Sequence, residues 1–187
     1  VARDERLLSP DYVRSAMSSH LAPLHFRNQL WVLSDLFSAF SSIAQETWPG
    51  LRILDLTSNK NLPGEPLYLL VQNDGFVAEV AAMGHGLQMW LQTMWFLTRS
   101  QDDPAVILDE PDVYMHADLQ RRLIRFLRNQ KRQVIVTTHS VEIMAEVDAE
   151  EILVIDRSKS QSKFATSLPS VQRLVEHIGS VHNIHLV

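Results

Sequence analysis

A short apolar run that ends in two acids constrains the fold more than any other part of the chain. Residues 105–111 read Ala-Val-Ile-Leu-Asp-Glu-Pro, so four apolar residues lead directly into Asp109 and Glu110. Such a run predicts a strand buried on both faces, as in a parallel sheet. Pro104 and Pro111 bound it, because proline cannot continue a central ladder. The two carboxylates suit a metal ion and an attacking water beside a phosphate chain, although a solvated acidic turn would show the same dipeptide.

Two further apolar runs predict an α/β fold with a mostly parallel sheet and flanking helices. Residues 133–137 and 151–156 read as strands, and the sequence predicts a helix at 118–129 between the acidic strand and the first of them. Alternating strands and helices are typical of parallel sheets with right-handed crossovers. His139 follows the strand at 133–137, and ligands bind at the carboxyl ends of such strands. We also expect a last helix at 170–178.

Residues 1–50 are predicted to be a helical arm or insertion, and residues 51–187 a separate lobe. Ser9 and Pro10 are typical of a helix start. A longer helix is predicted from Pro23, and its apolar stripe consists of Phe26, Leu30, Leu33, Phe37, Phe40 and Ala44. This stripe fits either a helix packed on its own domain or a short antiparallel coiled-coil arm.

An antiparallel hairpin is predicted to precede the acidic strand. Its strands are expected at 67–71 and 76–80, joined by the turn Asn73-Asp74-Gly75, after a first strand at 51–56. Gly84 and Gly86 then come directly before a predicted helix. A helix N-terminus offers unpaired N–H groups to an anion, although a plain turn between hairpin and helix would look the same.

Together these motifs resemble the carboxyl-terminal half of an ABC-class ATPase head. Residues 106–111 match the Walker B segment, residues 137–140 look like the segment of the switch histidine, and residues 84–88 resemble the signature segment. Within the class, residues 109–120 are more similar to RecF-like and OLD-family ATPases than to transporters. A transporter subunit is a weaker alternative, because the Ser-Ala-Leu-Asp of transporters is absent.

The resemblance implies a role for each site residue, with ATP and Mg²⁺ as cofactors. Asp109 would hold the metal, Glu110 would polarise the attacking water, and His139 would hydrogen-bond the γ-phosphate. The remaining residues would act between two copies of the head: Gly84, His85, Gly86 and Gln88 would face the γ-phosphate of the second copy, and Asp112 and His116 would lie in a loop at the dimer interface. Within one chain we therefore expect more than about 15 Å between Gly86 and the Glu110 carboxylate.

The chain departs from the family pattern at several positions. His85 stands where Ser is usual, Leu87 where a second Gly is usual, and Ala117 where Pro is usual after His116. No Gly-x-x-x-x-Gly-Lys-Ser/Thr occurs, and the chain begins at Val1, so we expect a piece of a longer protein whose phosphate-binding loop precedes it. By itself the chain should bind ATP weakly and hydrolyse none.

Composition excludes several classes of protein. Without cysteine the chain has neither disulfides nor a Cys-based zinc site, which suits the cytoplasm. It contains no membrane-length apolar run and no secretory signal. Its net charge of −5 gives no basic field for nucleic acid.

The resemblance still favours a DNA-associated protein that acts in repair or in defence against phage. Any Toprim nuclease domain, as OLD-family proteins carry, would lie beyond Val187. The alternative is a degenerate, non-catalytic interaction module.

Overall fold

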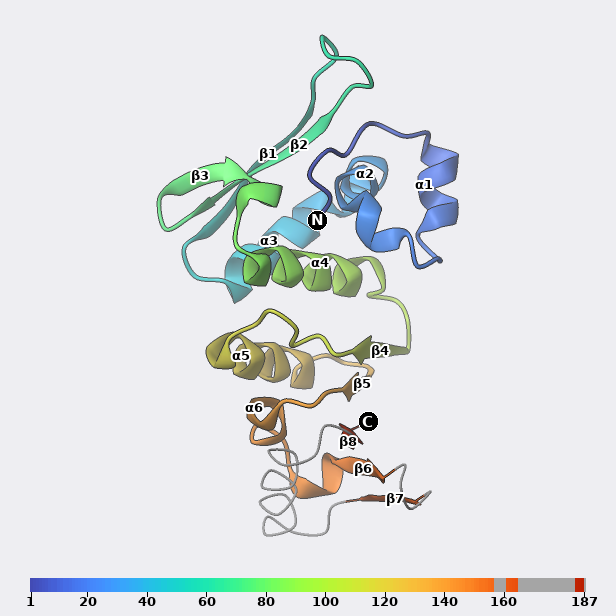
Figure 1. The fold of residues 1–187 in the computed structure, drawn as a ribbon, viewed down its shortest axis with the longest axis vertical. Coiled ribbons are helices and arrows are strands. Elements are labelled where there is room, and N and C mark those ends of the chain that lie inside the picture. The colour runs from blue at the N-terminus through green and yellow to red at the C-terminus, as the bar shows by residue number, and fades with distance from the viewer. Residues whose placement is uncertain (157–160, 165–183, 187) are drawn as a thin grey trace. The chain divides into compact units, whose positions relative to one another are not determined.

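The computed structural model describes residues 1–156, 161–164 and 184–186. The chain divides into two compact units, Val1–Gln101 and Asp102–Val187, and each is described by itself. Figure 1 follows the elements along the chain. The helix predicted at 170–178 lies outside the described residues, and the predicted division at residue 50 stays a prediction.

The first unit begins with short helices that carry the predicted apolar stripe. Helix α1 (Pro10–Ala16) starts as predicted, with Ser9 Oγ accepting a hydrogen bond from the Tyr12 N–H. The continuous helix predicted from Pro23 is wrong, because the chain leaves helical geometry at Leu33 (φ −106°, ψ 48°). The segments are η1 (Ala22–His25), α2 (Phe26–Val32), η2 (Ser34–Leu36) and α3 (Phe37–Thr47).

The apolar stripe nevertheless packs inside its own unit. Phe26, Leu30, Phe40 and Ala44 are buried. The Phe40 ring lies edge-on to Trp95, with 5.7 Å between the ring centroids. This packing matches the first of the two predicted alternatives, a helix packed on its own domain, and not a coiled-coil arm.

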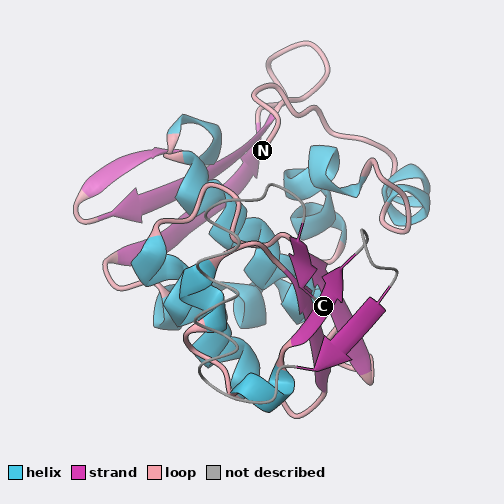
Figure 2. Ribbon diagram, turned by 60° about the horizontal axis from the view of Figure 1, so that its bottom comes forward, coloured by secondary structure: helices cyan, strands magenta, loops and turns pink. Residues whose placement is uncertain are grey.

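The predicted hairpin forms and belongs to a three-stranded antiparallel sheet. Its strands are β1 (Leu51–Ser58), β2 (Leu67–Asn73) and β3 (Phe76–Glu79), in the order β1-β2-β3. Asp74 (φ 48°) and Gly75 (φ 87°) make the turn between β2 and β3, where left-handed geometry suits these residue types. The strands lie side by side in Figure 2, and the loop joining β1 to β2 extends away from the helices in Figure 1.

A short turn and a long helix follow this sheet. The turn is η3 (Val80–Ala82), and helix α4 (His85–Arg99) packs against α3. Two buried indoles tie α4 to the preceding helices: Trp90 Nε1 donates to Thr47 Oγ1 at 3.0 Å, and Trp95 Nε1 donates to Gln29 Oε1 at 2.8 Å. These bonds satisfy the polar edge of each ring, so both rings can be buried without an unpaired donor.

The second unit contains the predicted strand–helix–strand arrangement. It consists of β4 (Ala105–Asp109), α5 (Ala117–Arg128), β5 (Gln133–Thr137) and a short α6 (Val141–Met144). Strands β4 and β5 are parallel, and Asp109 is in register with Thr137. The acidic strand and the histidine strand therefore end at the same edge of the sheet.

The prediction that this acidic strand is buried on both faces is wrong. Val106 and Leu108 are buried, but Ile107 between them is 64% exposed. This period-2 alternation means that only one face of β4 is covered. A continuous apolar run cannot distinguish these two cases, because it places apolar side chains on either face.

The third predicted strand forms, but its predicted parallel pairing is wrong. Strand β6 (Leu153–Asp156) follows the turn η4 (Ala149–Glu151) and pairs antiparallel with β7 (Gln161–Phe164) and β8 (Ile184–Leu186). Four apolar or acidic residues specify a strand but not its partner. The partners come from later in the chain, so the parallel sheet contains β4 and β5 among the described residues.

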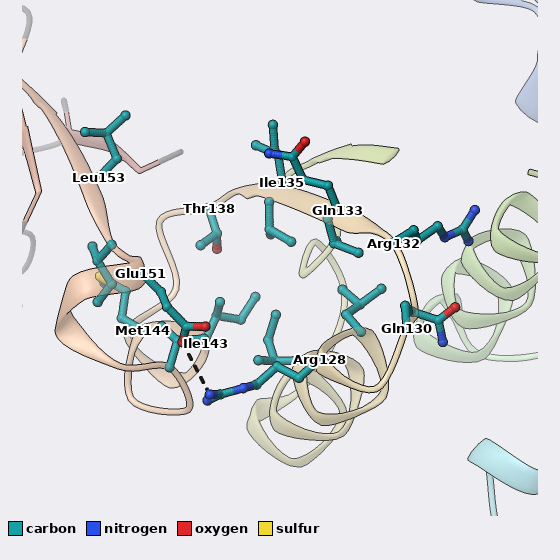
Figure 3. Close-up of a pocket in the computed structure, with 16 residues that line it drawn as sticks. Arg128, Gln130, Arg132, Gln133, Ile135, Thr138, Ile143, Met144, Glu151 and Leu153 are labelled. Atoms are coloured by element: carbon teal, nitrogen blue, oxygen red, sulfur yellow. Dashed lines mark ion pairs between the residues drawn. The ribbon is translucent and has the colours of Figure 1, made fainter. Parts of the chain in front are cut away.

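A cavity of about 470 Å³ lies within the second unit. Figure 3 shows residues from β5, α5, α6 and the start of β6 around it. Ile135, Ile143 and Met144 contribute apolar walls, and an ion pair between Arg128 and Glu151 (3.4 Å) lies at its edge. Thr138 is also part of the lining, and its hydroxyl is important to the site described next.

Candidate functional site

The two predicted acids lie where β4 ends beside β5. Thr137 Oγ1 donates a hydrogen bond to Asp109 Oδ1. The Glu110 N–H donates to the Thr137 carbonyl at 2.9 Å, which continues the ladder one residue past the strand. Both acids are therefore fixed to the end of β5, although Asp109 itself remains exposed.

Glu110 and His139 lie in direct contact. His139 Nε2 is 3.1 Å from Glu110 Oε1, and the side chains are 36% and 44% exposed respectively. Glu110 has a φ of 45°, which costs a non-glycine residue free energy and is found mainly where surrounding structure enforces it. The structure thus brings His139 to the adjacent acids Asp109 and Glu110, which lie 30 and 29 residues before it in the sequence.

The loop after Glu110 carries the other two predicted residues of this unit. Asp112 Oδ1 accepts a hydrogen bond from Thr138 Oγ1 at 2.6 Å, and its carbonyl accepts from the Met115 N–H at 2.9 Å. His116 is exposed at the N-cap position of α5, and its carbonyl receives the N–H of Leu119 at 2.9 Å. The predicted roles of Asp112 and His116 in a dimer stay predictions.

The predicted signature residues belong to the first unit, at the start of α4. Gly84 is the N-cap residue and His85 the first helical residue, and both are exposed. A Cβ built on Gly84 would meet nothing within 4 Å, so the space beside this helix end is open. Gly86 is half-buried. Its predicted separation from Glu110 stays a prediction, since the two residues lie in different units.

Gln88 is used inside the chain. Its side chain is 6% exposed, and Nε2 donates to the carbonyls of Met83 (2.7 Å) and Ala81 (3.3 Å). Both carbonyls belong to the turn that leads into Gly84. The amide therefore holds that turn, while direct phosphate contact by Gln88 stays a prediction.

Sequence reasoning missed the other residues that hold this turn. Glu79 Oε2 accepts the Ala81 N–H at 2.8 Å, and Arg27 Nε donates to Glu79 Oε1 at 2.8 Å. Arg27 is fully buried. The signal available in sequence is an arginine between the apolar stripe residues Phe26 and Leu30, but Glu79 lies 52 residues further along the chain.

We expect Gln88→Leu to lower the free energy of unfolding by about 1–3 kcal/mol, the cost of leaving buried carbonyls without a donor. Gln92→Leu on the same helix is the matched control, because Gln92 Nε2 makes one long bond of 3.4 Å to the Gln88 carbonyl. Urea unfolding of both variants measures the difference. Equal losses would contradict a specific role for the Gln88 amide.

A ladder of ion pairs joins α5 to α6 and the residues after it. Arg121 pairs with Glu142, Arg125 with Glu146 at 2.7 Å, and Arg128 with Asp148 at 3.2 Å. The hydrogen bond from Arg125 lowers the pKa of the Glu146 carboxyl. The Arg125–Glu146 pair therefore stabilises the folded state at any pH above the pKa that the Glu146 carboxyl has in the unfolded chain. This stabilisation is lost as the pH falls through the lower pKa of the folded state. The ladder supports α6, whose N-cap residue Ser140 is next to His139.

The strand-end acids fit a magnesium ion. Asp109 supplies the hard carboxylate oxygens that Mg²⁺ prefers, and this ion is usually held by one or two carboxylates together with water and substrate phosphates. Among all the described residues, this site included, no group of three or more His, Cys, Asp or Glu side chains could hold a metal, so water and phosphate oxygens would have to complete the coordination. No helix among the described residues is long and apolar enough to cross a membrane.

Comparison with solved structures shows the same fold in SMC ATPase heads. One SMC structure comes from work on ATP-driven dimerization and DNA-stimulated activation of SMC ATPases: it is 20% identical, its TM-score is 0.62, and the match covers 82% of this chain and 97% of that one. The Smc head domain with a coiled coil and joint from Pyrococcus yayanosii is 20% identical with a TM-score of 0.59, over 81% of this chain and 30% of that one.

A third structure extends the same likeness. The Smc head domain with an extended coiled coil from Pyrococcus furiosus, bound to the C-terminal domain of ScpA, is 16% identical with a TM-score of 0.55, over 91% of this chain and 43% of that one. This chain therefore spans nearly all of the first relative and under half of the other two. At such identities the likeness shows the fold, which confirms the predicted α/β ABC-ATPase-like architecture.

The sequence comparisons identify the family. No curated protein sequence matches the chain. The model of the AAA_21 family, described as AAA domain, putative AbiEii toxin, Type IV TA system, matches residues 3–145, which is more than half of the chain and includes every predicted site residue. The chain has the fold of the SMC ATPase heads, and it belongs to this family of AAA domains.

Proposed function

We propose that the protein containing this chain binds and hydrolyses Mg-ATP at the carboxyl ends of β4 and β5. The observation that carries the proposal is the 3.1 Å contact between His139 Nε2 and Glu110 Oε1. Asp109 is the residue directly before Glu110. A base, a hydrogen-bond donor and a metal-binding carboxylate at one strand edge are the groups that phosphoryl transfer to water requires.

Each residue then has a distinct task. Glu110 accepts a hydrogen bond from the attacking water and orients it, and His139 donates to the phosphate oxygen that gains charge. Asp109, tied to Thr137, offers its exposed carboxylate to the metal. Bound Mg²⁺ would neutralise phosphate charge as it develops.

The first unit supports a second part of the proposal, that two copies of the head close on ATP. The N-terminus of α4 combines an open side at Gly84 with an exposed His85. Helix N-termini attract phosphate through unpaired N–H groups and the helix dipole. ATP-driven dimerization of the SMC ATPase relative is consistent with this arrangement.

A DNA-associated role, in repair or in defence against phage, is the finer part of the proposal. Support comes from the SMC relative, whose activation is stimulated by DNA, and from the family's description as a putative toxin of a type IV toxin–antitoxin system. Adding duplex or single-stranded DNA to the full-length protein should raise its ATPase rate. An unchanged rate would remove the DNA part and leave the ATPase part standing.

The test of the ATPase is a steady-state assay on the full-length protein. His139→Ala should lower kcat about 100-fold or more, because it removes a donor to the developing charge. His20→Ala is the matched control, since His20 is an exposed histidine of the other unit. A wild-type protein that neither hydrolyses ATP nor dimerises with it would favour a non-catalytic interaction module instead.

A further inference from the structure

The residues on both sides of His139 are bound to the loop that follows Glu110. Thr138 is 4% exposed, and its Oγ1 donates to Asp112 Oδ1 at 2.6 Å while accepting the Ser140 N–H at 2.9 Å. A hydroxyl this buried has little access to water that could replace a lost partner. Thr138 is one of the residues that line the cavity in Figure 3, and apolar side chains such as Ile135 and Ile143 line it as well.

A second connection lies on the other side of His139. Ser140 Oγ donates to Gln120 Oε1, and Gln120 Nε2 donates to the Met115 carbonyl at 2.7 Å. Asp112 and Met115 are themselves joined, because the Asp112 carbonyl accepts the Met115 N–H at 2.9 Å. Residues 138 and 140 are thus tied to both ends of the segment 112–115.

These ties matter because the pair that they bracket cannot set its own geometry. Glu110 and His139 are 44% and 36% exposed. An ion pair or hydrogen bond this exposed contributes little free energy, since water competes for both partners and both side chains lose rotamer freedom. The positions of the two residues must therefore come from their backbones. The strand ends are joined by the bond from the Glu110 N–H to the Thr137 carbonyl, and beyond the strands the two loops are joined through Thr138–Asp112 and Ser140–Gln120.

We propose that Thr138 and Asp112 are positioning residues for ATP hydrolysis: the bond between their side chains holds His139 against Glu110 in the arrangement that the reaction uses. This inference rests on the proposed function. It also gives Asp112 a task within its own chain, in addition to the predicted one at a dimer interface. The Ser140–Gln120 bond is the second support of the same arrangement.

The decisive experiment is a double-mutant cycle in the full-length protein. Thr138→Val keeps the size and branching of the side chain, suits the apolar cavity and removes the donor, and Asp112→Ala removes the acceptor. Each should lower kcat about tenfold or more, as loss of a supporting hydrogen bond does at catalytic sites, while KM for ATP changes less than about twofold. The double variant should be no slower than Thr138→Val, because the bond that Asp112→Ala removes is already absent there.

The variant Thr138→Ser distinguishes a loss of positioning from a folding defect. It keeps the hydroxyl and should recover most of the wild-type kcat, whereas Thr138→Val should not, at equal thermal stability of the two variants. Multiplicative losses in the cycle, or a wild-type kcat in Thr138→Val, would overturn the proposal.

A measurement without ATP separates the inference from the ATPase proposal. In NMR spectra of the full-length protein, the imidazole signals of His139 should shift in Thr138→Val while those of His20 stay in place. If the His139 signals move but neither Glu110→Gln nor His139→Ala affects hydrolysis in the full-length protein, the proposed function fails and the structural tie stands. If hydrolysis depends on Glu110 but the His139 signals are unmoved, the positioning role fails instead.

Discussion

Replacing Glu110 with Gln in the full-length protein should lower ATP hydrolysis about 100-fold or more, because a general base contributes on the order of 10²–10⁴ to rate. The amide keeps the size of the carboxylate and can still contact His139 Nε2, which lies 3.1 Å from Oε1 in the wild type. It cannot accept a proton from water. ATP binding should therefore survive while turnover is lost.

An ATP-bound dimer should accumulate in this variant. Size-exclusion chromatography with light scattering, run with and without Mg-ATP, measures the change in mass. Glu150→Gln is the matched control, since Glu150 is an exposed glutamate of the same unit. Asp109→Asn should differ by weakening Mg²⁺-dependent ATP binding itself. Wild-type turnover by Glu110→Gln would remove Glu110 from its assigned role.

Local signals predicted the elements that position these acids. The strand at β4 and the strand at β5 were predictable because each is a short apolar run with clear boundaries, and their parallel pairing followed from the helix between them. Convergence of Asp109, Glu110 and His139 then follows from topology alone. The chemical roles come from the family resemblance and stay predictions.

What the sequence could not predict depends on partners far along the chain. The orientation of β6 is set by β7 and β8, and nothing within Leu153–Asp156 specifies it. The inward side chain of Gln88 depends on two carbonyls of a preceding turn. The break at Leu33 could have been predicted from the sequence, because Ser34 and Asp35 are residues that favour helix starts over helix interiors.

The largest effect on stability is expected at Arg27. Its guanidinium is fully buried, with NH1 3.2 Å from Glu5 Oε2 and Nε donating to Glu79 Oε1 at 2.8 Å. Arg27→Met preserves much of the volume but leaves the Glu5 carboxylate buried without its cation. Breaking a buried pair from one side costs about 3–5 kcal/mol, a large share of the roughly 5–15 kcal/mol that holds a typical domain folded.

Arg14→Met provides the control, because Arg14 is exposed on α1 and the same substitution there should change stability by less than about 0.5 kcal/mol. Urea unfolding of both variants gives the comparison. The double variant Arg27→Met/Glu5→Gln should be more stable than the sum of its single losses predicts, since the second change removes the charge that the first leaves unpaired. Additive losses would show that the pair is not the source of the cost.

Loss of the Arg27 guanidinium should also destabilise the turn before Gly84, the candidate phosphate-binding turn, because Arg27 contacts this turn through Glu79. Glu79 accepts the Ala81 N–H at 2.8 Å and also the Leu69 N–H at 3.2 Å, so one carboxylate joins β2 to the turn before Gly84. Without the guanidinium, that carboxylate, whose side chain is 23% exposed, is free to turn toward water. Hydrogen exchange of the Ala81 amide should then accelerate in Arg27→Met more than the global loss of stability explains. An acceleration equal to the global loss would mean that Arg27 stabilises the unit as a whole and leaves the turn to Gln88.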